Sequence, residues 1–116
     1  MKKKIAELWV KALRSGEFKQ GTRYLDNNGK YCCLGVLSVL GLVEGVCEYE
    51  KNSENHGIYN KSRVYLPTAI QKWAGIESSG GEFTNNTNTS LAELNDVDRL
   101  NFDEIADYIE KNWRNL

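Results

Sequence analysis

The chain has few of the side chains that most often carry out chemistry. Its 116 residues include one histidine, one proline and three cysteines. Histidine is a common general base and metal ligand, but His56 lies in a polar stretch with no partner near it in the sequence. Cys32 and Cys33 are neighbours, which would strain a disulfide between them, so we interpret them as reduced core residues. The sequence therefore predicts no catalytic residues, no metal site and no cofactor.

The chain also lacks a dominant charge and a long apolar run. Its formal net charge is −1, so no overall basic field would attract duplex nucleic acid or an anionic membrane. No stretch approaches the roughly 20 apolar residues that cross a bilayer. The lysines at 2–4 resemble the start of a signal peptide, but Glu7 and Lys11 interrupt the apolar region that such a peptide needs next. We expect a cytoplasmic protein with neither duplex nucleic acid nor a membrane as partner.

The segment from Tyr24 to Leu40 is the most informative part of the sequence. Asn28 and Gly29 form the strongest short hairpin signal, because both tolerate the positive φ of a type I′ turn. The return strand leads into an uncharged apolar stretch, which is expected to be a buried helix over 34–42. Gly35 within it indicates that another backbone packs close by. The segment therefore predicts a hairpin followed by a buried helix.

Helical spacing and turn residues predict the rest of the fold. An apolar stripe from Ile5 to Leu13 predicts a first helix that ends at Gly16, and Pro67 begins a helix that Gly75 ends. Residues 46–60 are interpreted as a loop or hairpin, and 77–89 as the longest flexible segment. We expect a single α+β domain over 1–116, with a small antiparallel sheet or hairpins, about four helices and an amphipathic C-terminal helix.

Two capping signals define the C-terminal third. Ser90 with Glu93 predicts a short helix over 91–94, and Asn101 with Glu104 begins the last helix. One apolar stripe follows that helix: Phe102, Ile105, Ala106, Ile109, Trp113 and Leu116. Because the stripe exceeds what a small core readily covers, we expect it to contribute to a homo-oligomer interface.

Four segments in order resemble a known family. They are WVKALRSGEFKQGTRYL, YCCLGVL, LPTAIQKWAGI and LAELNDVDRLNFDEIADYIE. The sequence is similar to phage-encoded Thoeris anti-defence proteins of the first-described type, with their RSGEYKQG-like start, FCCLGVL-like centre and LND…SFxEIAxxI-like end. The resemblance covers residues 5–110 apart from 46–60 and 77–89. Tyr31 stands where the family has Phe, and Asn101 where it has Ser.

The resemblance implies a sponge and not an enzyme. Proteins of that family bind cyclic ADP-ribose isomers made by bacterial immunity and hold them away from the effector, in the cytoplasm of the infected host. They act as homodimers or larger homo-oligomers, with the ligand enclosed near the subunit interface. Some also bind cyclic oligonucleotides at a separate site.

Sequestration of such a ligand needs an adenine platform, hydrogen bonds to the base edge and cations for the pyrophosphate. Phe83 can supply the platform, although a lone loop aromatic anchors on the core about as often. Asn95 and Asp96 offer an amide and an acceptor, and they also suit a helix end. The cations near the loop and the last helix are Arg63, Arg99, Lys111 and Arg114.

Two other classes of function compete with the sponge. An enzyme would need converging acid, base or nucleophile residues, and the sequence shows no such constellation. A protein-interaction module that blocks a host protein is the alternative, because three tryptophans and six tyrosines can act as interface anchors.

Overall fold

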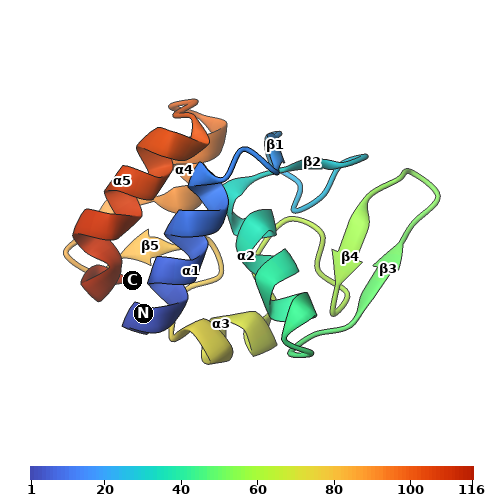
Figure 1. Ribbon diagram of the computed structural model, residues 1–116, viewed down its shortest axis with the longest axis horizontal. Helices are drawn as coiled ribbons and strands as arrows, with labels where there is room; N and C mark the ends of the chain where they lie inside the picture. The colour runs from blue at the N-terminus through green and yellow to red at the C-terminus, as the bar shows by residue number, and fades with distance from the viewer.

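Two helices from opposite ends of the chain lie side by side and run antiparallel (Figure 1). The computed structural model describes all 116 residues except the side chain of Thr87. The helices are α1 (Lys3–Arg14) and α5 (Phe102–Asn112). Their buried residues are Ala6, Trp9, Val10 and Leu13 on α1, and Phe102, Ile105, Ala106 and Ile109 on α5. Each helix thus covers the apolar stripe of the other.

This pairing corrects one prediction about the last helix. Ile105, Ala106 and Ile109 are fully buried within the single chain, and Leu116 is buried beside them. Only Trp113, in the short 3₁₀ helix η1 (Trp113–Asn115), remains partly exposed. The expectation that the stripe exceeds what the core covers is wrong, because α1 supplies a matching apolar face.

Helix α2 (Cys33–Val43) lies at the centre of the core. The indole N–H of Trp9 donates to the Cys33 carbonyl at 3.0 Å, which fixes α1 against the start of α2. A methyl group built on Gly35 would overlap the Leu25 carbonyl oxygen. The close backbone approach predicted at Gly35 is therefore confirmed, and only glycine fits there.

The predicted turn at Asn28-Gly29 is confirmed, but the strand pairing around it differs. Both residues have positive φ, at 53° and 83°, and Asn27 and Lys30 exchange backbone hydrogen bonds of 2.8 and 3.1 Å. After the turn, β2 (Lys30–Tyr31) pairs in parallel with β1 (Lys19–Gln20). The antiparallel ladder ends after one bridge, because the residues before the turn pair with the segment around His56 instead.

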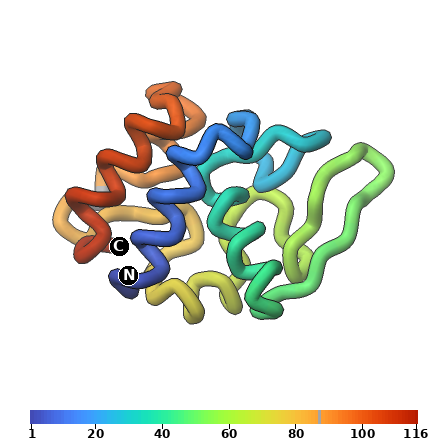
Figure 2. Tube along the Cα trace, in the orientation of Figure 1, coloured from blue at the N-terminus to red at the C-terminus, as the bar shows by residue number. Residues whose placement is uncertain are grey.

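Of the two forms expected for 46–60, a loop or a hairpin, the structure has the hairpin, which projects away from α1 and α5 (Figure 2). Strand β3 (Tyr49–Lys51) pairs antiparallel with β4 (Gly57–Tyr59). Asp26 joins this hairpin to the turn: its carboxylate accepts from the Gly29 N–H at 2.9 Å and from the Tyr49 hydroxyl at 3.3 Å. Asp26 is itself buried, so this junction lies inside the molecule.

The segment expected to be flexible contains a second hairpin. Strand β5 (Glu82–Phe83) pairs antiparallel with β6 (Asn86–Ser90). The Thr84 N–H donates to the Asn115 carbonyl at 2.7 Å, which ties the hairpin to the C-terminal turn. Contacts with the C-terminal turn thus hold residues 77–89 in place, and the polar sequence of this segment does not indicate them.

The capping predictions hold for the remaining helices. Gly75, with a positive φ of 74°, ends α3 (Thr68–Ala74), and Pro67 stands at its N-cap. The Ser90 hydroxyl accepts from the Glu93 N–H at the start of α4 (Leu91–Asp96). Asn101 and Glu104 form both hydrogen bonds of a capping box. The molecule is an α+β fold with five α-helices and small two-stranded sheets.

The helices are short compared with the thickness of a bilayer. Among the described residues, no helix combines the length and apolar character needed to cross a membrane.

Gly35 provides a test of the close contact between α2 and the chain before the turn. Gly35→Ala is expected to lower the free energy of unfolding by about 3 kcal/mol or to prevent folding, because the methyl group meets backbone and not a flexible side chain. Gly16→Ala is the control: its φ is 77° but the space beside it is open, so it should cost only about 1 kcal/mol. Urea denaturation measures both, and equal losses would contradict the close packing.

Candidate functional site

Most of the predicted site residues fall into two groups, one before the start of α5 and one near its C-terminal end. Asn95, Asp96 and Arg99 precede the helix, and the Arg63 carbonyl accepts from the nearby Leu25 N–H at 2.8 Å. The other group, at the C-terminal end, consists of Phe83, Lys111 and Arg114. The helical rise puts about 15 Å between Asn101 and Lys111 along the axis. One chain therefore does not bring all seven residues to one small ligand.

Phe83 does not provide an open stacking platform. Its side chain is only 2% exposed, and its ring packs against Tyr108 of α5 with a centroid distance of 5.1 Å. The hairpin of β5 and β6 points this ring into the core. The ligand-stacking role predicted for Phe83 is wrong for the structure described, and the alternative, a loop anchor, is the one observed.

Asn95 is a buried structural residue and not a free base-reading group. Its side-chain oxygen accepts from Gln20 Nε2 at 3.0 Å and from the Cys33 N–H at 3.1 Å. Its side-chain nitrogen donates to the Gly21 carbonyl at 2.9 Å and to Asp96 Oδ1 at 2.8 Å. A primary amide has two donors and two acceptor positions, and all four are used here. Asn95 therefore has nothing left to offer a ligand.

Asp96 keeps a free acceptor beside a hollow. Its Oδ1 atom accepts from Asn95 and from the Arg23 N–H at 2.8 Å, while Oδ2 has no hydrogen bond to any described residue. We name the adjoining cavity, about 460 Å³ in volume, the tyrosine hollow. It is lined by Arg23, Cys32, Leu34, Val64, Tyr65, Ala92 and Asp96.

A second, more polar hollow of about 440 Å³ lies beside the residues just before Arg23. We name it the amide hollow, and its lining is Gln20, Gly21, Thr22, Asn27, Lys30, Asn95, Arg99, Leu100 and Asn101. Lys30 and Arg99 are its two cations, and both are exposed. The consecutive residues Asn95 and Asp96 link the two hollows, since each residue lines one of them.

Two arginines near this pair have strained backbones. Arg23 and Arg99 have φ values of 70° and 54°, in the left-handed region that costs a non-glycine residue about 1 kcal/mol. The Asp96 carboxylate holds Arg23 there by accepting its N–H, and the Arg23 guanidinium lies over the Tyr24 ring at 5.6 Å. Such strain gathers at functional sites more than elsewhere. At this site Asp96 can accept a hydrogen bond from an N–H group of a ligand, and the nearby cations can bind an anion.

Among the lining residues that sequence reasoning missed, three bear on ligand binding: Arg23, Lys30 and Tyr65. Lys30 could have been considered from the sequence, because the predicted turn at Asn28-Gly29 reverses the chain direction just before it. Nothing in the sequence indicates Tyr65, since a single aromatic before Pro67 shows no periodicity.

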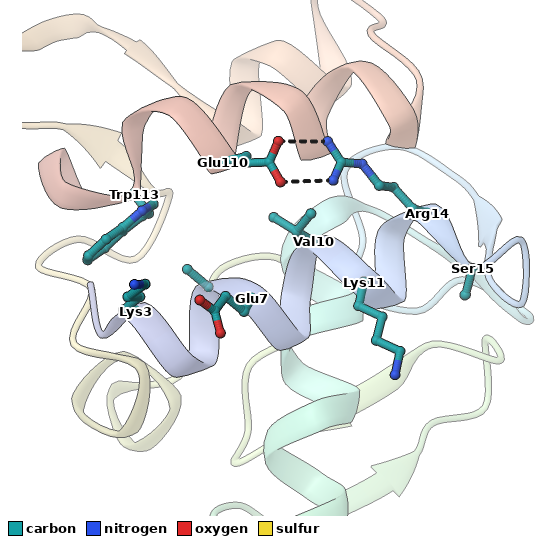
Figure 3. Close-up of a pocket in the computed structure, with 9 residues that line it drawn as sticks. Lys3, Glu7, Val10, Lys11, Arg14, Ser15, Glu110 and Trp113 are labelled. Atoms are coloured by element: carbon teal, nitrogen blue, oxygen red, sulfur yellow. Dashed lines mark hydrogen bonds and ion pairs between the residues drawn. The ribbon is translucent and has the colours of Figure 1, made fainter.

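A groove larger than either hollow lies elsewhere, between α1 and α5 (Figure 3). It has a volume of about 740 Å³, with Ala6, Val10 and Trp113 as its apolar part. Its arginine, Arg14, donates to Glu110 at 3.0 Å and to Asp107 at 2.6 Å. These hydrogen bonds raise the pKa of Arg14 and occupy both terminal nitrogens of its guanidinium. None of the predicted site residues lines this groove, and its arginine is already paired.

The thiols and the histidine are buried. Burial raises the pKa of the Cys32 thiol to about 12 and that of Cys33 well above its ordinary value, so both stay protonated at neutral pH. His56, expected in a polar loop, is buried and stacks on Tyr24 at a centroid distance of 4.0 Å. In the part of the chain that the structure describes, no three His, Cys, Asp or Glu residues are grouped to hold a metal ion.

Asn95 can be tested as the residue that joins these elements. Asn95→Ala should lower the free energy of unfolding by about 2–4 kcal/mol, because it leaves buried donors and acceptors unpaired on three elements. Asn112→Ala is the matched control, since that amide makes one hydrogen bond, to the Tyr108 carbonyl, from a half-buried position. Asn112→Ala should lower the free energy of unfolding by less than about 1 kcal/mol. Equal losses in thermal or urea unfolding would contradict the role of Asn95.

Comparison with known proteins gives one match. Neither the curated proteins nor the solved structures contain a match to the chain. A family described as a domain of unknown function, DUF8296, matches residues 1–113. Because this match spans almost the whole chain, the protein belongs to the DUF8296 family.

Proposed function

We propose that the protein is a phage anti-defence sponge that binds a cyclic ADP-ribose-type signalling nucleotide in the cytoplasm of the infected host and does not cleave it. The four ordered sequence segments that resemble the Thoeris anti-defence family support this proposal. The geometry around the end of α4 supports it independently of that resemblance.

The observation that carries the proposal is the free Oδ2 atom of Asp96 with cations on either side. Arg23 lines the same hollow, and Lys30 and Arg99 line the adjoining one. An adenine amino group is a donor that a carboxylate oxygen accepts, and a pyrophosphate carries negative charge that arginine binds through paired N–H groups. One nucleotide thus matches both kinds of group.

Sequestration needs no activated nucleophile, and the thiol beside the site is not activated. Cys32 lines the tyrosine hollow, but burial raises its pKa to about 12. A thiol attacks as its thiolate, so Cys32 is a poor nucleophile at neutral pH. This chemistry favours retention of the ligand over its cleavage.

A homo-oligomer would reconcile the two groups of cations. Lys111 is about 15 Å farther along α5 than Asn101, and Arg114 lies beyond it in η1, so both are too far to share a small ligand with Arg99 in one chain. A second copy of the chain can bring its C-terminal cations against the hollows of the first. We therefore propose a homodimer or larger assembly that encloses the ligand between subunits.

A blocker of a host protein remains the second candidate. The observation in its favour is the groove of about 740 Å³ between α1 and α5, with the partly exposed Trp113 at one end (Figure 3). Tryptophan is a frequent anchor in protein interfaces. Protein purified from cells that make the signal separates the two functions: a sponge releases material with an adenine-like absorbance on heating, whereas a protein blocker does not.

Ligand capture is the direct test of the sponge. Calorimetry with a cyclic ADP-ribose isomer should show one site per subunit with a sub-micromolar constant, which corresponds to more than about 8 kcal/mol. Mass spectrometry of the released ligand should show it unaltered. Arg99→Ala should weaken binding about tenfold through the loss of a charge-assisted contact. Lys72→Ala, at an exposed cation on α3 outside both hollows, should bind like the unaltered protein.

Other outcomes of that experiment would contradict the proposal in different ways. Recovery of a cleaved ligand would make the protein an enzyme. A heat of binding with a cyclic oligonucleotide alone would show that the sponge binds a different class of ligand. No heat of binding with any cyclic nucleotide would favour the protein blocker.

Assembly can be tested at the C-terminal end of α5. A second copy that approaches Lys111 and Arg114 should also cover Trp113, which stacks under the Arg114 guanidinium at 4.4 Å. Trp113→Glu should therefore shift the protein towards monomer in sedimentation equilibrium. Val43→Glu, at an exposed apolar residue at the end of α2 that lines neither hollow, is the control and should keep the assembly. A Trp113→Glu protein that sediments like the unaltered one would rule out this interface.

A further inference from the structure

We propose that the tyrosine hollow is the nucleobase subsite, in which a 6-aminopurine stacks on Tyr65 and donates its amino group to Asp96 Oδ2. The phosphate next to that base then pairs with Arg23. This inference rests on the proposed function, and it assigns base stacking to Tyr65 and phosphate binding to Arg23, two residues that the sequence did not indicate.

Tyr65 is the aromatic residue best placed to stack. It is the most exposed aromatic side chain in the described part of the chain, at 54%, whereas Phe83 is at 2%. Its ring lines the hollow, and one edge lies over Gly80: a methyl group built there would be 3.7 Å from Tyr65 Cε1. The backbone next to it is also held, because the Leu66 N–H donates to the Ser79 carbonyl at 2.9 Å. The ring is therefore supported from behind and available to a ligand.

The rest of the lining suits a flat, mainly apolar ring. Leu34, Val64 and Ala92 supply apolar surface. The volume, about 460 Å³, lies within the 300–1,000 Å³ range of small-molecule sites. A purine stacked on a tyrosine and packed on aliphatic side chains would bury both of its faces. The hollow thus combines an aromatic wall with an apolar floor.

Asp96 gives the hollow its specificity. Because Oδ1 is already used by Asn95 and Arg23, only Oδ2 is left, and as a carboxylate oxygen it can only accept. Adenine presents an amino donor at its 6-position, whereas hypoxanthine presents an oxygen that would face the carboxylate. The hollow should therefore prefer adenine to hypoxanthine in otherwise identical ligands.

Arg23 is held where a phosphate attached to the base's sugar can reach it. Its left-handed backbone is fixed by the Asp96 carboxylate, the group assigned to the base. The Asp96 side chain thus both recognises the base and holds the backbone of Arg23, the residue that binds the anion. Arg23 is exposed, so its guanidinium can move onto a phosphate without leaving a buried partner behind.

The test compares a cyclic ADP-ribose isomer with its hypoxanthine counterpart by calorimetry, and uses circular dichroism to confirm folding. The unaltered protein should bind the adenine form at least tenfold more tightly. Tyr65→Ala should weaken that binding about tenfold, the scale of one lost base–aromatic stack, and Tyr65→Phe should retain it.

Asp96→Asn tests the hydrogen bond without disturbing the fold. The amide oxygen can still accept from Asn95 and Arg23, while the amide nitrogen replaces Oδ2 and turns the acceptor into a donor. The preference should then shift from adenine towards hypoxanthine. A variant that keeps the original preference would overturn the assignment of Asp96.

Arg23→Gly tests the anion contact, with Lys61→Gly as its matched control. Both residues are exposed cations with left-handed backbones, at φ values of 70° and 69°, but Lys61 lies in the turn after β4 and lines neither hollow. Glycine accepts this conformation, so neither change should harm folding. Only Arg23→Gly should weaken binding, by about tenfold.

The outcomes separate this inference from the proposed function. Binding by the unaltered protein that survives Tyr65→Ala, Asp96→Asn and Arg23→Gly undiminished would overturn the subsite and leave the sponge standing. No binding of either ligand by the unaltered protein would overturn both.

Discussion

The four hydrogen bonds of the Asn95 side chain hold together three parts of the chain that the sequence separates widely. They connect the segment at Gln20 and Gly21, the first turn of α2 and the end of α4. A buried amide is stabilising only when it is fully paired, so this junction has a single favourable arrangement. Both hollows form around it. The candidate site therefore depends on a residue whose own hydrogen-bonding groups are all used within the fold.

Local physical chemistry explains which parts of the fold were predictable. The Asn28-Gly29 turn, the glycine at 35 and the Asn101–Glu104 capping box each depend on the conformation or size of a few neighbouring residues, and the structure has all three. The parallel pairing of β1 with β2 was not predictable, because a two-residue strand carries no periodic pattern. The core face of α5 was misjudged for a related reason, since its cover comes from residues some 90 positions earlier.

The candidate site was only half visible in the sequence. Asp96 and Arg99 were recognised from their residue types, and each lines one of the hollows. Asn95 was recognised for the wrong role, because its four partners are invisible without the fold. Arg23 could not be identified, since arginine has no preference for the left-handed conformation and only the Asp96 carboxylate holds it there. The stacking role predicted for Phe83 does not fit the structure, because the hairpin of β5 and β6 directs its ring into the core.

The pairing of α1 with α5 also has a consequence for synthesis. Contacts between residues far apart in the sequence form late, because the intervening chain must first be brought together. As the chain leaves the ribosome, the part of the apolar face of α1 that packs on α5 has no cover until α5 has emerged. Ala6 and Val10, which line the groove between the two helices, are therefore exposed to chaperones until then. The core of the nascent chain is therefore complete only after α5 has been made.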